Sequence, residues 1–260
     1  MFCFSAAAVR SQSIYSSTAS LRRLCSAAAG EGAKKGYWVT QVVDIKDKAK
    51  YSDYEEASMS TFAPGNKYGA KTLISEPIAK VLKGNENIQL AALVEFDSVQ
   101  AAIDVWDDPE YVAARSLLGD TNDESSVVER RVCVIEADPI EEIHPGDGFW
   151  LNHVEEILDE EKFDRYAESS MPVFDSAHFG QVIHQHVGSK KIKMAAALRF
   201  NSIERALDTY NDSPEYISAR FAGTMEDVED HVVARTICAV EVPETKLRRS
   251  RAKSRGNGRQ

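Results

Sequence analysis

Hydrophobic positions in residues 36–137 follow two periods, which predict both strands and helices. Residues 36–43 are a run of aromatic and β-branched residues, typical of a strand. Residues 51–62 carry apolar side chains at steps of three and four, which predicts an amphipathic helix. Ser98 caps a second helix. Three further apolar runs predict strands at 71–76, 89–96 and 127–136. The predicted order is β-α-β-β-α-β.

The same order of patterns returns in residues 148–242. The stretch Pro109–Arg115 (PEYVAAR) recurs as Pro214–Arg220 (PEYISAR). Strands are expected at 149–154, 181–187, 192–200 and 231–242, and helices at 160–174 and 202–210. Repetition of ordered features at this spacing predicts a tandem duplication.

A β-α-β-β-α-β unit places both helices on one face of a four-stranded antiparallel sheet and leaves the other face bare. Two such units in one chain can cover each other. We therefore predict an α+β fold of two ferredoxin-like repeats, whose sheets pack face to face as an internal pseudo-dimer around a barrel-like space. The repeats are expected at 36–137 and 148–243, joined by a Pro- and Gly-containing linker at 138–147.

The two ends of the chain differ from this body. Residues 1–35 are rich in Ser, Ala and Arg, with one acidic residue, as in an organellar transit peptide, and Arg22-Arg23 resembles a processing site. The mitochondrial matrix is favoured over the plastid, and a disordered cytosolic leader is the alternative. Residues 244–260 predict a disordered basic tail, either a solvated terminus or a tether to an acidic partner surface or anionic lipid.

Charge and cysteine usage exclude several classes of function. The net charge is −10 although both ends are basic, so the acidic body argues against a nucleic-acid partner. The sequence lacks an apolar run long enough for a transmembrane helix. The four cysteines form no CxxC pair, so neither a zinc site nor a disulfide framework is expected. Cys133 and Cys238 occupy apolar strands and predict buried free thiols.

Several motifs in the first repeat resemble the family called domain of unknown function 1330. They are Gly36-Tyr37-Trp38, Tyr51 and Tyr54, Tyr68-Gly69, Glu95-Phe96, and Asp108-Pro109-Glu110-Tyr111 with Arg115. The second repeat departs from them at Phe149, Phe179 and Ser213, and Glu76-Pro77 and Val187-Gly188 stand where many members carry an Arg-Gly-Gly-like segment. The resemblance implies a dimeric α+β barrel. Its superfamily includes monooxygenases, haem enzymes and binding proteins, so the fold alone does not decide the function.

The first candidate site is the pair Glu95 and Arg199, which precede matching phenylalanines on the third strand of each repeat. Side chains alternate between the two faces of a strand. If Phe96 and Phe200 face the helices, Glu95 and Arg199 therefore face the barrel. There they can form an ion pair across the interface, line a ligand or catalytic pocket, or lie at its rim.

The second candidate is a histidine group in the second repeat. His184 and His186 alternate on a predicted strand and share a face, and His153 is expected on the neighbouring strand. Such a group can bind a transition metal or haem iron, or act as a general base on an enolisable substrate. Histidines also fill half-polar sheet interiors, and without a carboxylate at ligand spacing no cofactor is predicted.

Two functions remain open, and the sequence does not decide whether the protein is an enzyme. One is a non-catalytic organellar binding or accessory subunit, working with a protein partner or a larger assembly. The other is a small-molecule enzyme or ligand-binding protein with its site between the sheets, using His184, His186, Glu95 and Arg199. A filled space between the sheets favours the first, and a polar-lined cavity there favours the second.

Overall fold

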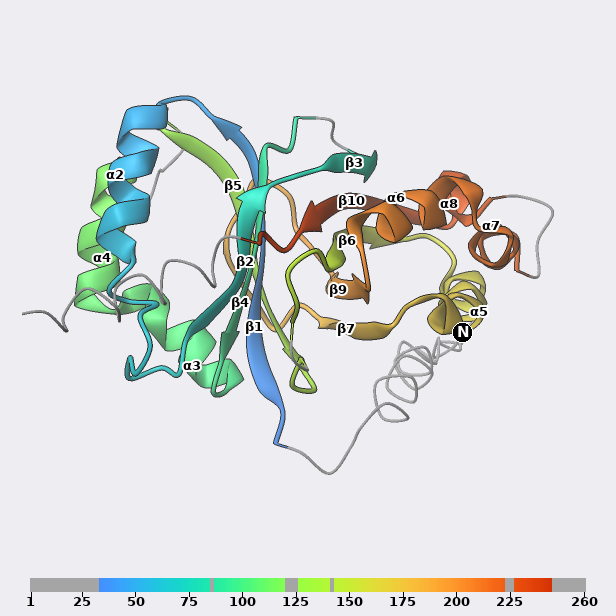
Figure 1. Cartoon of the computed structure of the whole chain (residues 1–260), viewed down its shortest axis with the longest axis horizontal. Coiled ribbons are helices and arrows are strands. Elements are labelled where there is room, and N and C mark those ends of the chain that lie inside the picture. The colour runs from blue at the N-terminus through green and yellow to red at the C-terminus, as the bar shows by residue number, and fades with distance from the viewer. Residues whose placement is uncertain (1–32, 85–86, 120–125, 141–142, 223–226, 245–260) are drawn as a thin grey trace, which may run out of the picture.

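The computed structural model describes residues 33–84, 87–119, 126–140, 143–222 and 227–244. It contains two antiparallel five-stranded sheets, with strand orders β2-β4-β1-β5-β8 and β3-β10-β6-β9-β7. The sheets pack face to face, and each carries its helices on the outer side (Figure 1). The predicted leader and basic tail lie outside the described residues, and the transit peptide and the organellar address stay predictions.

The first half of the chain supplies one set of helices and most of the first sheet. Its strands are β1 (Lys35–Ile45), β2 (Lys71–Pro77), β3 (Lys80–Lys83), β4 (Leu90–Phe96) and β5 (Val128–Ala137). Its α-helices are α2 (Lys48–Ser58), α3 (Val99–Asp104) and α4 (Pro109–Arg115), with 3-10 turns η1 (Val105–Asp107) and η2 (Ser116–Leu118).

The second half follows the same order of elements. Its strands are β6 (Gly148–Ile157), β7 (Ser176–Gln181), β8 (His184–Val187), β9 (Met194–Phe200) and β10 (Val233–Glu241). Its helices are α5 (Glu160–Ser170), the 3-10 turn η4 (Met171–Val173), α6 (Ile203–Asp212), α7 (Pro214–Arg220) and α8 (Val228–His231).

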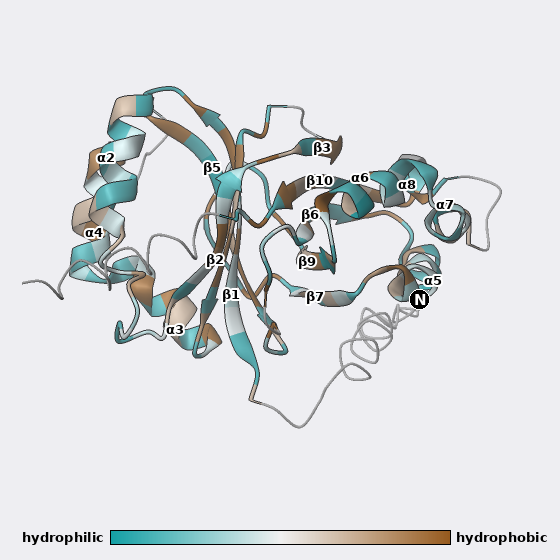
Figure 2. Cartoon of the chain, viewed as in Figure 1, coloured by the Kyte–Doolittle hydropathy of each residue, from teal (hydrophilic) through white to brown (hydrophobic). Residues whose placement is uncertain are grey.

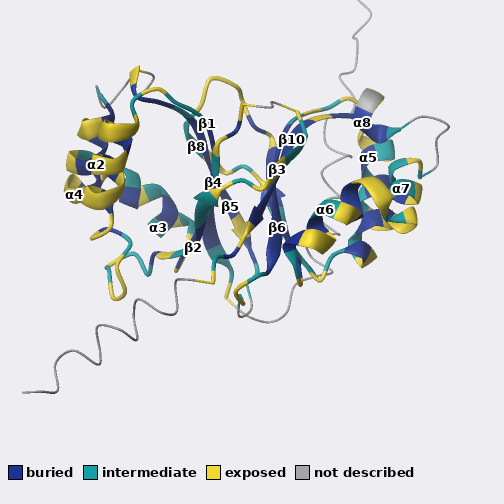
Figure 3. Cartoon of the chain, turned by 45° about the horizontal axis from the view of Figure 1, so that its top comes forward, coloured by how far each residue is buried: buried dark blue, intermediate teal, exposed yellow. Residues whose placement is uncertain are grey.

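Three apolar cores hold these layers together. One lies between each sheet and its helices, and the third joins the sheets through residues of both, including Val39 and Leu93 of the first and Phe149 and Leu151 of the second. Figure 2 shows the helices with alternating teal and brown, as amphipathic helices require, and Figure 3 shows the strands buried between exposed helix surfaces. The predicted α+β fold with face-to-face sheets is confirmed.

The number of strands in each sheet differs from the prediction. The short strand β3 was not predicted, and the strand expected at 181–187 is the short strand β8, so that β7 before it was missed. β3 and β8 each cross to the opposite sheet. β3 pairs with β10 of the second half, and β8 pairs with β5 of the first. Each sheet thus gains a fifth strand from the other half. This exchange satisfies backbone groups along the edges of β5 and β10 that four-stranded sheets would leave open.

Caps fix the repeated Pro-Glu-Tyr stretches as helix starts. The Asp108 carboxylate accepts a hydrogen bond from the Glu110 N–H (2.9 Å), and the Ser213 hydroxyl accepts one from the Tyr216 N–H (3.2 Å). Proline follows each cap at the first helical position, where its missing N–H costs nothing. These stretches are therefore structural.

Polar side chains also lock the two sheets in register. Gln41 Nε2 on β1 donates to the Leu151 carbonyl on β6 (3.1 Å), while His153 Nε2 on β6 donates to the Val39 carbonyl on β1 (3.0 Å). Both side chains are fully buried. Because each hydrogen bond crosses the interface in the opposite direction, the pair specifies one relative position of the sheets.

Gly36 allows α3 to approach β1 closely, and we expect Gly36→Ala to destabilise the protein. A Cβ built there would lie 2.4 Å from the Ser98 carbonyl oxygen and 2.8 Å from the Val99 Cα, both backbone atoms. Overpacking of this kind costs about 1–3 kcal/mol. Denaturant unfolding measures the loss, and a change below about 0.5 kcal/mol would show that α3 moves away freely.

The sequence predicted buried free thiols and no membrane-spanning helix. Cys133 and Cys238 are free and buried, and burial raises the pKa of each thiol to about 12, so both are chemically inert thiols. Within the described ranges, no helix has the length and apolar character needed to cross a membrane.

Candidate functional site

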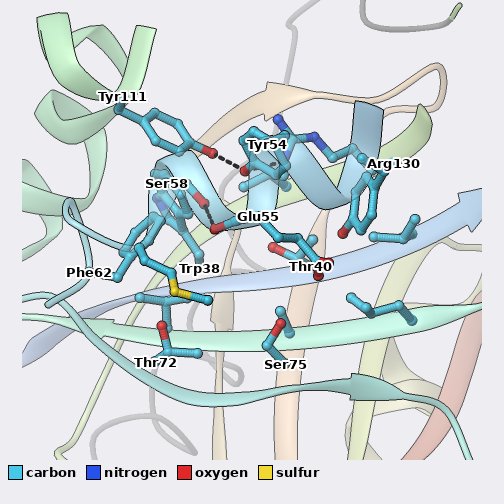
Figure 4. A pocket seen from close by; sticks show the side chains of 17 residues that line it. Trp38, Thr40, Tyr54, Glu55, Ser58, Phe62, Thr72, Ser75, Tyr111 and Arg130 are labelled. Carbon is cyan, nitrogen blue, oxygen red and sulfur yellow. Dashed lines mark hydrogen bonds between the residues drawn. The ribbon is translucent and has the colours of Figure 1, made fainter. Parts of the chain in front are cut away.

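A cavity of about 430 Å³ lies between α2 and the helix-facing side of the first sheet. It is not the space between the sheets, which the apolar core fills. Figure 4 shows side chains from α2 and α4 facing β1, β2 and β4 across this cavity. The lining residues are Trp38, Thr40, Val42, Tyr51, Tyr54, Glu55, Ser58, Met59, Phe62, Thr72, Ser75, Leu90, Ala92, Val94, Tyr111, Arg130 and Val132.

Aromatic rings form much of the cavity wall. Trp38 contacts Phe62 and Tyr111, with ring centroids 5.8 and 5.6 Å apart, and its indole N–H donates to the Ala102 carbonyl (2.6 Å). The Trp38 ring is therefore fixed in position. Such fixed rings offer flat apolar surfaces against which an aromatic ligand can pack.

A buried arginine closes one end of the cavity. Arg130 on β5 donates from Nη1 to the Tyr54 hydroxyl (2.8 Å), and Tyr54 shares a second hydrogen bond with the Tyr111 hydroxyl (2.8 Å). The Arg130 guanidinium also lies over the Tyr54 ring, 5.0 Å from its centroid. The Arg130 cation therefore holds the two tyrosine side chains in place, and it also lines part of the cavity.

Polar groups occupy the sheet side and the mouth of the cavity. Thr40, Thr72 and Ser75 present hydroxyl groups from β1 and β2, and Glu55 of α2 is turned toward these strands (Figure 4). Glu55 is exposed at the mouth. Partial burial and the negative charge of Glu76 raise the pKa of the Glu55 carboxyl. The cavity thus combines apolar walls with a few oriented polar groups.

The equivalent place in the second half is closed. There the space under α5 amounts to about 60 Å³. Register with the central strands makes Phe179 the counterpart of Ser75, because Ser75 pairs with Ala92 and Phe179 with Ala196. The motif comparison, which set Phe179 in the place of Tyr68, was therefore wrong at this position. The Phe179 ring occupies the region that the small Ser75 hydroxyl leaves open. One scaffold therefore carries an open cavity in its first half and a filled one in its second.

Other substitutions follow the same trend. Thr72 corresponds to Ala177 by strand register, and Glu55 corresponds to Ala167 one residue after the matching tyrosines Tyr54 and Tyr166. The second-half space therefore lacks those hydroxyl and carboxyl groups as well as room. Asn152, Ser170 and Arg235 still line the second-half space, so the halves differ in room and in the Glu55 carboxylate.

The predicted pair Glu95 and Arg199 does face the side between the sheets but forms no mutual ion pair. Glu95 accepts a hydrogen bond from the Tyr37 hydroxyl (2.8 Å), while Arg199 forms an ion pair with Asp147 (2.9 Å). Each residue therefore has a partner from its own half. Neither lines the cavity under α2.

The histidine cluster is wrong in part. His184 and His186 do lie together, with ring centroids 4.6 Å apart, but β8 belongs to the first sheet rather than beside β6. His186 faces the helices, where it stacks on Trp106 (4.4 Å) and Nε2 donates to the Ala102 carbonyl. His153 is buried between the sheets instead. Strand exchange is the physical reason, since it carries β8 away from its own half.

These positions do not fit a metal or haem. No group of three or more His, Cys, Asp or Glu residues suited to a metal ion occurs among the residues that the structure describes. The described side chains that line the cavity include neither histidine nor cysteine. His186, which contacts Trp38 at the edge of the cavity, already uses Nε2 in a hydrogen bond. An axial imidazole or thiolate for haem is therefore lacking here.

The cavity itself was missed by sequence reasoning, although a signal was present. The matching tyrosines Tyr54 and Tyr166 set Glu55 against Ala167 in the sequence, whereas the match of Ser75 with Phe179 is visible only through strand register. A comparison of the halves for changed polarity, instead of shared motifs, would have pointed to the first helix.

One comparison with known proteins concerns the first half of the chain. The family model Domain of unknown function (DUF1330) matches residues 35–131. Residues 35–131 are therefore similar to this family. The cavity lies within this DUF1330 segment, whereas the tandem duplication of the domain stays a prediction, since the match ends before the second half. No curated protein sequence matches the chain.

Solved structures share the fold. A monooxygenase candidate from Fusobacterium nucleatum subsp. nucleatum is 10% identical, with a TM-score of 0.50 over 82% of this chain and 94% of that one. A monooxygenase candidate from Lactobacillus acidophilus is 14% identical, with a TM-score of 0.41 over 80% and 93%. A chlorite dismutase variant from Candidatus Nitrospira defluvii is 8% identical, with a TM-score of 0.43 over 81% and 92%. At these identities the likeness concerns the fold alone.

Proposed function

We propose that this protein binds a small organic molecule in the cavity between α2 and the first sheet. The observation that carries the proposal is the difference between the halves. The same scaffold leaves about 430 Å³ open beside Ser75 and fills the matching place with Phe179. A polar-lined cavity that is open in one half and filled in the other supports a role in binding.

The lining indicates the chemistry of the ligand. The rings of Trp38 and Phe62 suit a flat aromatic or conjugated body. Hydroxyl groups of Thr40 and Ser75 suit hydroxyl or carbonyl oxygens on that body, and the Arg130 cation favours an electron-rich oxygen. The proposed ligand class is therefore a planar aromatic molecule with one or two oxygen substituents.

The accessory-subunit hypothesis receives no support from the site. The filled space between the sheets would have favoured it, but that criterion assumed that only this space can hold a ligand. The cavity lies on the opposite face of the first sheet. Ligand binding by the DUF1330 segment therefore accounts for more of the observed side chains than a scaffold does.

We expect Ser75→Phe to abolish binding of 2-naphthol, a flat bicyclic phenol that serves as the probe. The introduced ring reproduces Phe179 of the closed half and takes up the cavity. Affinity should fall by about 100-fold or more, equivalent to about 2.8 kcal/mol of binding free energy. Calorimetric titration of the full chain measures this loss.

Ser75→Ala is the matched control, because it removes the same hydroxyl group but keeps the space open. It should weaken 2-naphthol binding only a few-fold, as expected for one hydrogen bond worth about 1 kcal/mol. Equal binding by the wild-type protein and the Ser75→Phe variant, with both folded, would place the binding site elsewhere and contradict the proposal.

A further inference from the structure

Glu55 is the one carboxylic acid that lines the described cavity, and ligand binding by itself gives it no task. We propose that Glu55 is a catalytic general base that removes a proton from a carbon atom next to a carbonyl group of the bound molecule. The substrate class is an aromatic molecule whose ketone lies one carbon away from the ring, so that the C–H bond between ring and carbonyl is acidic. This inference rests on the proposed binding function and extends it to a reaction.

The position of Glu55 suits proton transfer with exchange to solvent. Its side chain leaves α2 at the cavity mouth and is turned toward Thr40 and Ser75 on the sheet (Figure 4). A ligand on the sheet would therefore lie under the carboxylate. Because Glu55 is also exposed to solvent at the mouth, its proton can exchange with water between turnovers.

The surroundings of Glu55 increase its strength as a base. The neighbouring carboxylate Glu76 and partial burial both raise the pKa of the Glu55 carboxyl, so the carboxylate holds a proton more strongly than one in water. Arg130, whose Nη1 donates to Tyr54, adds positive charge to the cavity wall, and Thr40 adds a hydroxyl group. These groups suit the negative oxygen of an enolate.

The step needs no oxidant and no cofactor. A Glu55 carboxylate oxygen takes the proton, the C–H electron pair becomes the C=C bond of an enolate, and the carbonyl π pair moves to oxygen. The Glu55 carboxylic acid then returns a proton to carbon, which restores the ketone, or the enolate takes a proton on oxygen, which gives the enol. In D₂O, exchange at Glu55 delivers a deuteron to carbon instead.

The closed half supplies an internal comparison. Ala167 occupies the position that corresponds to Glu55, and Phe179 fills the space that a substrate would need. Carboxylate and space are therefore lost together. A carboxylate kept only for helix stability would have no reason to follow the presence of the cavity.

The test is hydrogen–deuterium exchange into 2-tetralone, a bicyclic ketone whose enol resembles 2-naphthol in shape. We expect the full-length protein in D₂O to accelerate exchange at the carbon between ring and carbonyl at least tenfold over an equal concentration of free acetate. Glu55→Gln should lose this acceleration while calorimetry shows 2-tetralone binding within about threefold of the wild type. Proton NMR follows the exchange.

Glu56→Gln is the matched control, because Glu56 is exposed on α2 and does not line the cavity. It should exchange at the wild-type rate. Binding of 2-tetralone without acceleration, or equal acceleration by Glu55→Gln, would overturn the catalytic role and leave the binding function intact. Failure of the wild-type protein to bind either 2-tetralone or 2-naphthol would overturn both.

Discussion

Glu229→Gln should destabilise the protein by about 3–5 kcal/mol. Glu229 and Arg235 form a bidentate ion pair inside the second half, with 1% and 3% of their side-chain surfaces exposed. Arg235 also donates to the Tyr166 and Tyr216 hydroxyls, at 2.9 and 3.2 Å. Removal of the carboxylate charge leaves a buried guanidinium without its counter-ion, which is among the costliest single changes. Denaturant unfolding measures the loss of free energy.

A double variant distinguishes the cost of an unpaired buried charge from the cost of losing the whole ion pair. Glu229→Leu combined with Arg235→Met removes both charges, and replacement of a whole buried pair by apolar residues is often close to neutral. The double variant should therefore be more stable than Glu229→Gln. If Glu229→Gln costs less than about 1 kcal/mol, Arg235 reaches water or another anion, and the second half is less tightly closed than described.

Stability should also fall steeply as pH drops below about 6.5, before most carboxylates take up protons. Burial lowers the pKa of His153 to about 3, although its hydrogen bond to Val39 opposes this, and burial lowers the pKa of His186 similarly. Both imidazoles stay neutral in the folded protein, whereas the unfolded chain binds protons from 6.5 downward. The stabilisation is full above that pH and is lost toward pH 3. Each histidine contributes a slope of about 1.4 kcal/mol per pH unit.

His153→Gln removes one of the two histidines that bind a proton when the chain unfolds. Glutamine already serves at the matching position of β1, where Gln41 donates across the interface, so the variant should keep the fold. The slope of unfolding free energy between pH 6 and pH 5 should fall by about 1.4 kcal/mol per pH unit. The exposed His231→Gln variant is the control. An unchanged slope in His153→Gln would mean that His153 is protonated in the folded state.

Much of the fold could be predicted because strand and helix periods dominate long elements. Buried strands such as β4 and β9 read as continuous apolar runs, and Ser98 announces its helix by its cap. The exchange of β3 and β8 could not be predicted. These strands are four residues long, and their choice of sheet depends on tertiary contacts such as the close approach of Gly84 to Arg235 and Thr236.

The candidate site was harder to predict for the same physical reason. The alternation of side chains along a strand predicted that Glu95 and Arg199 face the space between the sheets, as they do. It could not show that this space is filled. Whether a cavity exists depends on side-chain volumes summed across several elements, such as Ser75 on β2 and Phe62 beyond α2. A single residue gives no sign of it. Only the contrast with the second half makes the missing volume visible.

The most direct test of the ligand-binding account is a crystal structure of the full chain grown with 2-naphthol. The account predicts the naphthol ring between α2 and the strands β1, β2 and β4, packed against Trp38 with its hydroxyl group near Thr40 or Ser75. The place beside Phe179 in the second half should stay empty of ligand. Electron density for the naphthol between the two sheets or under α5, with the first-half cavity unchanged, would contradict the account.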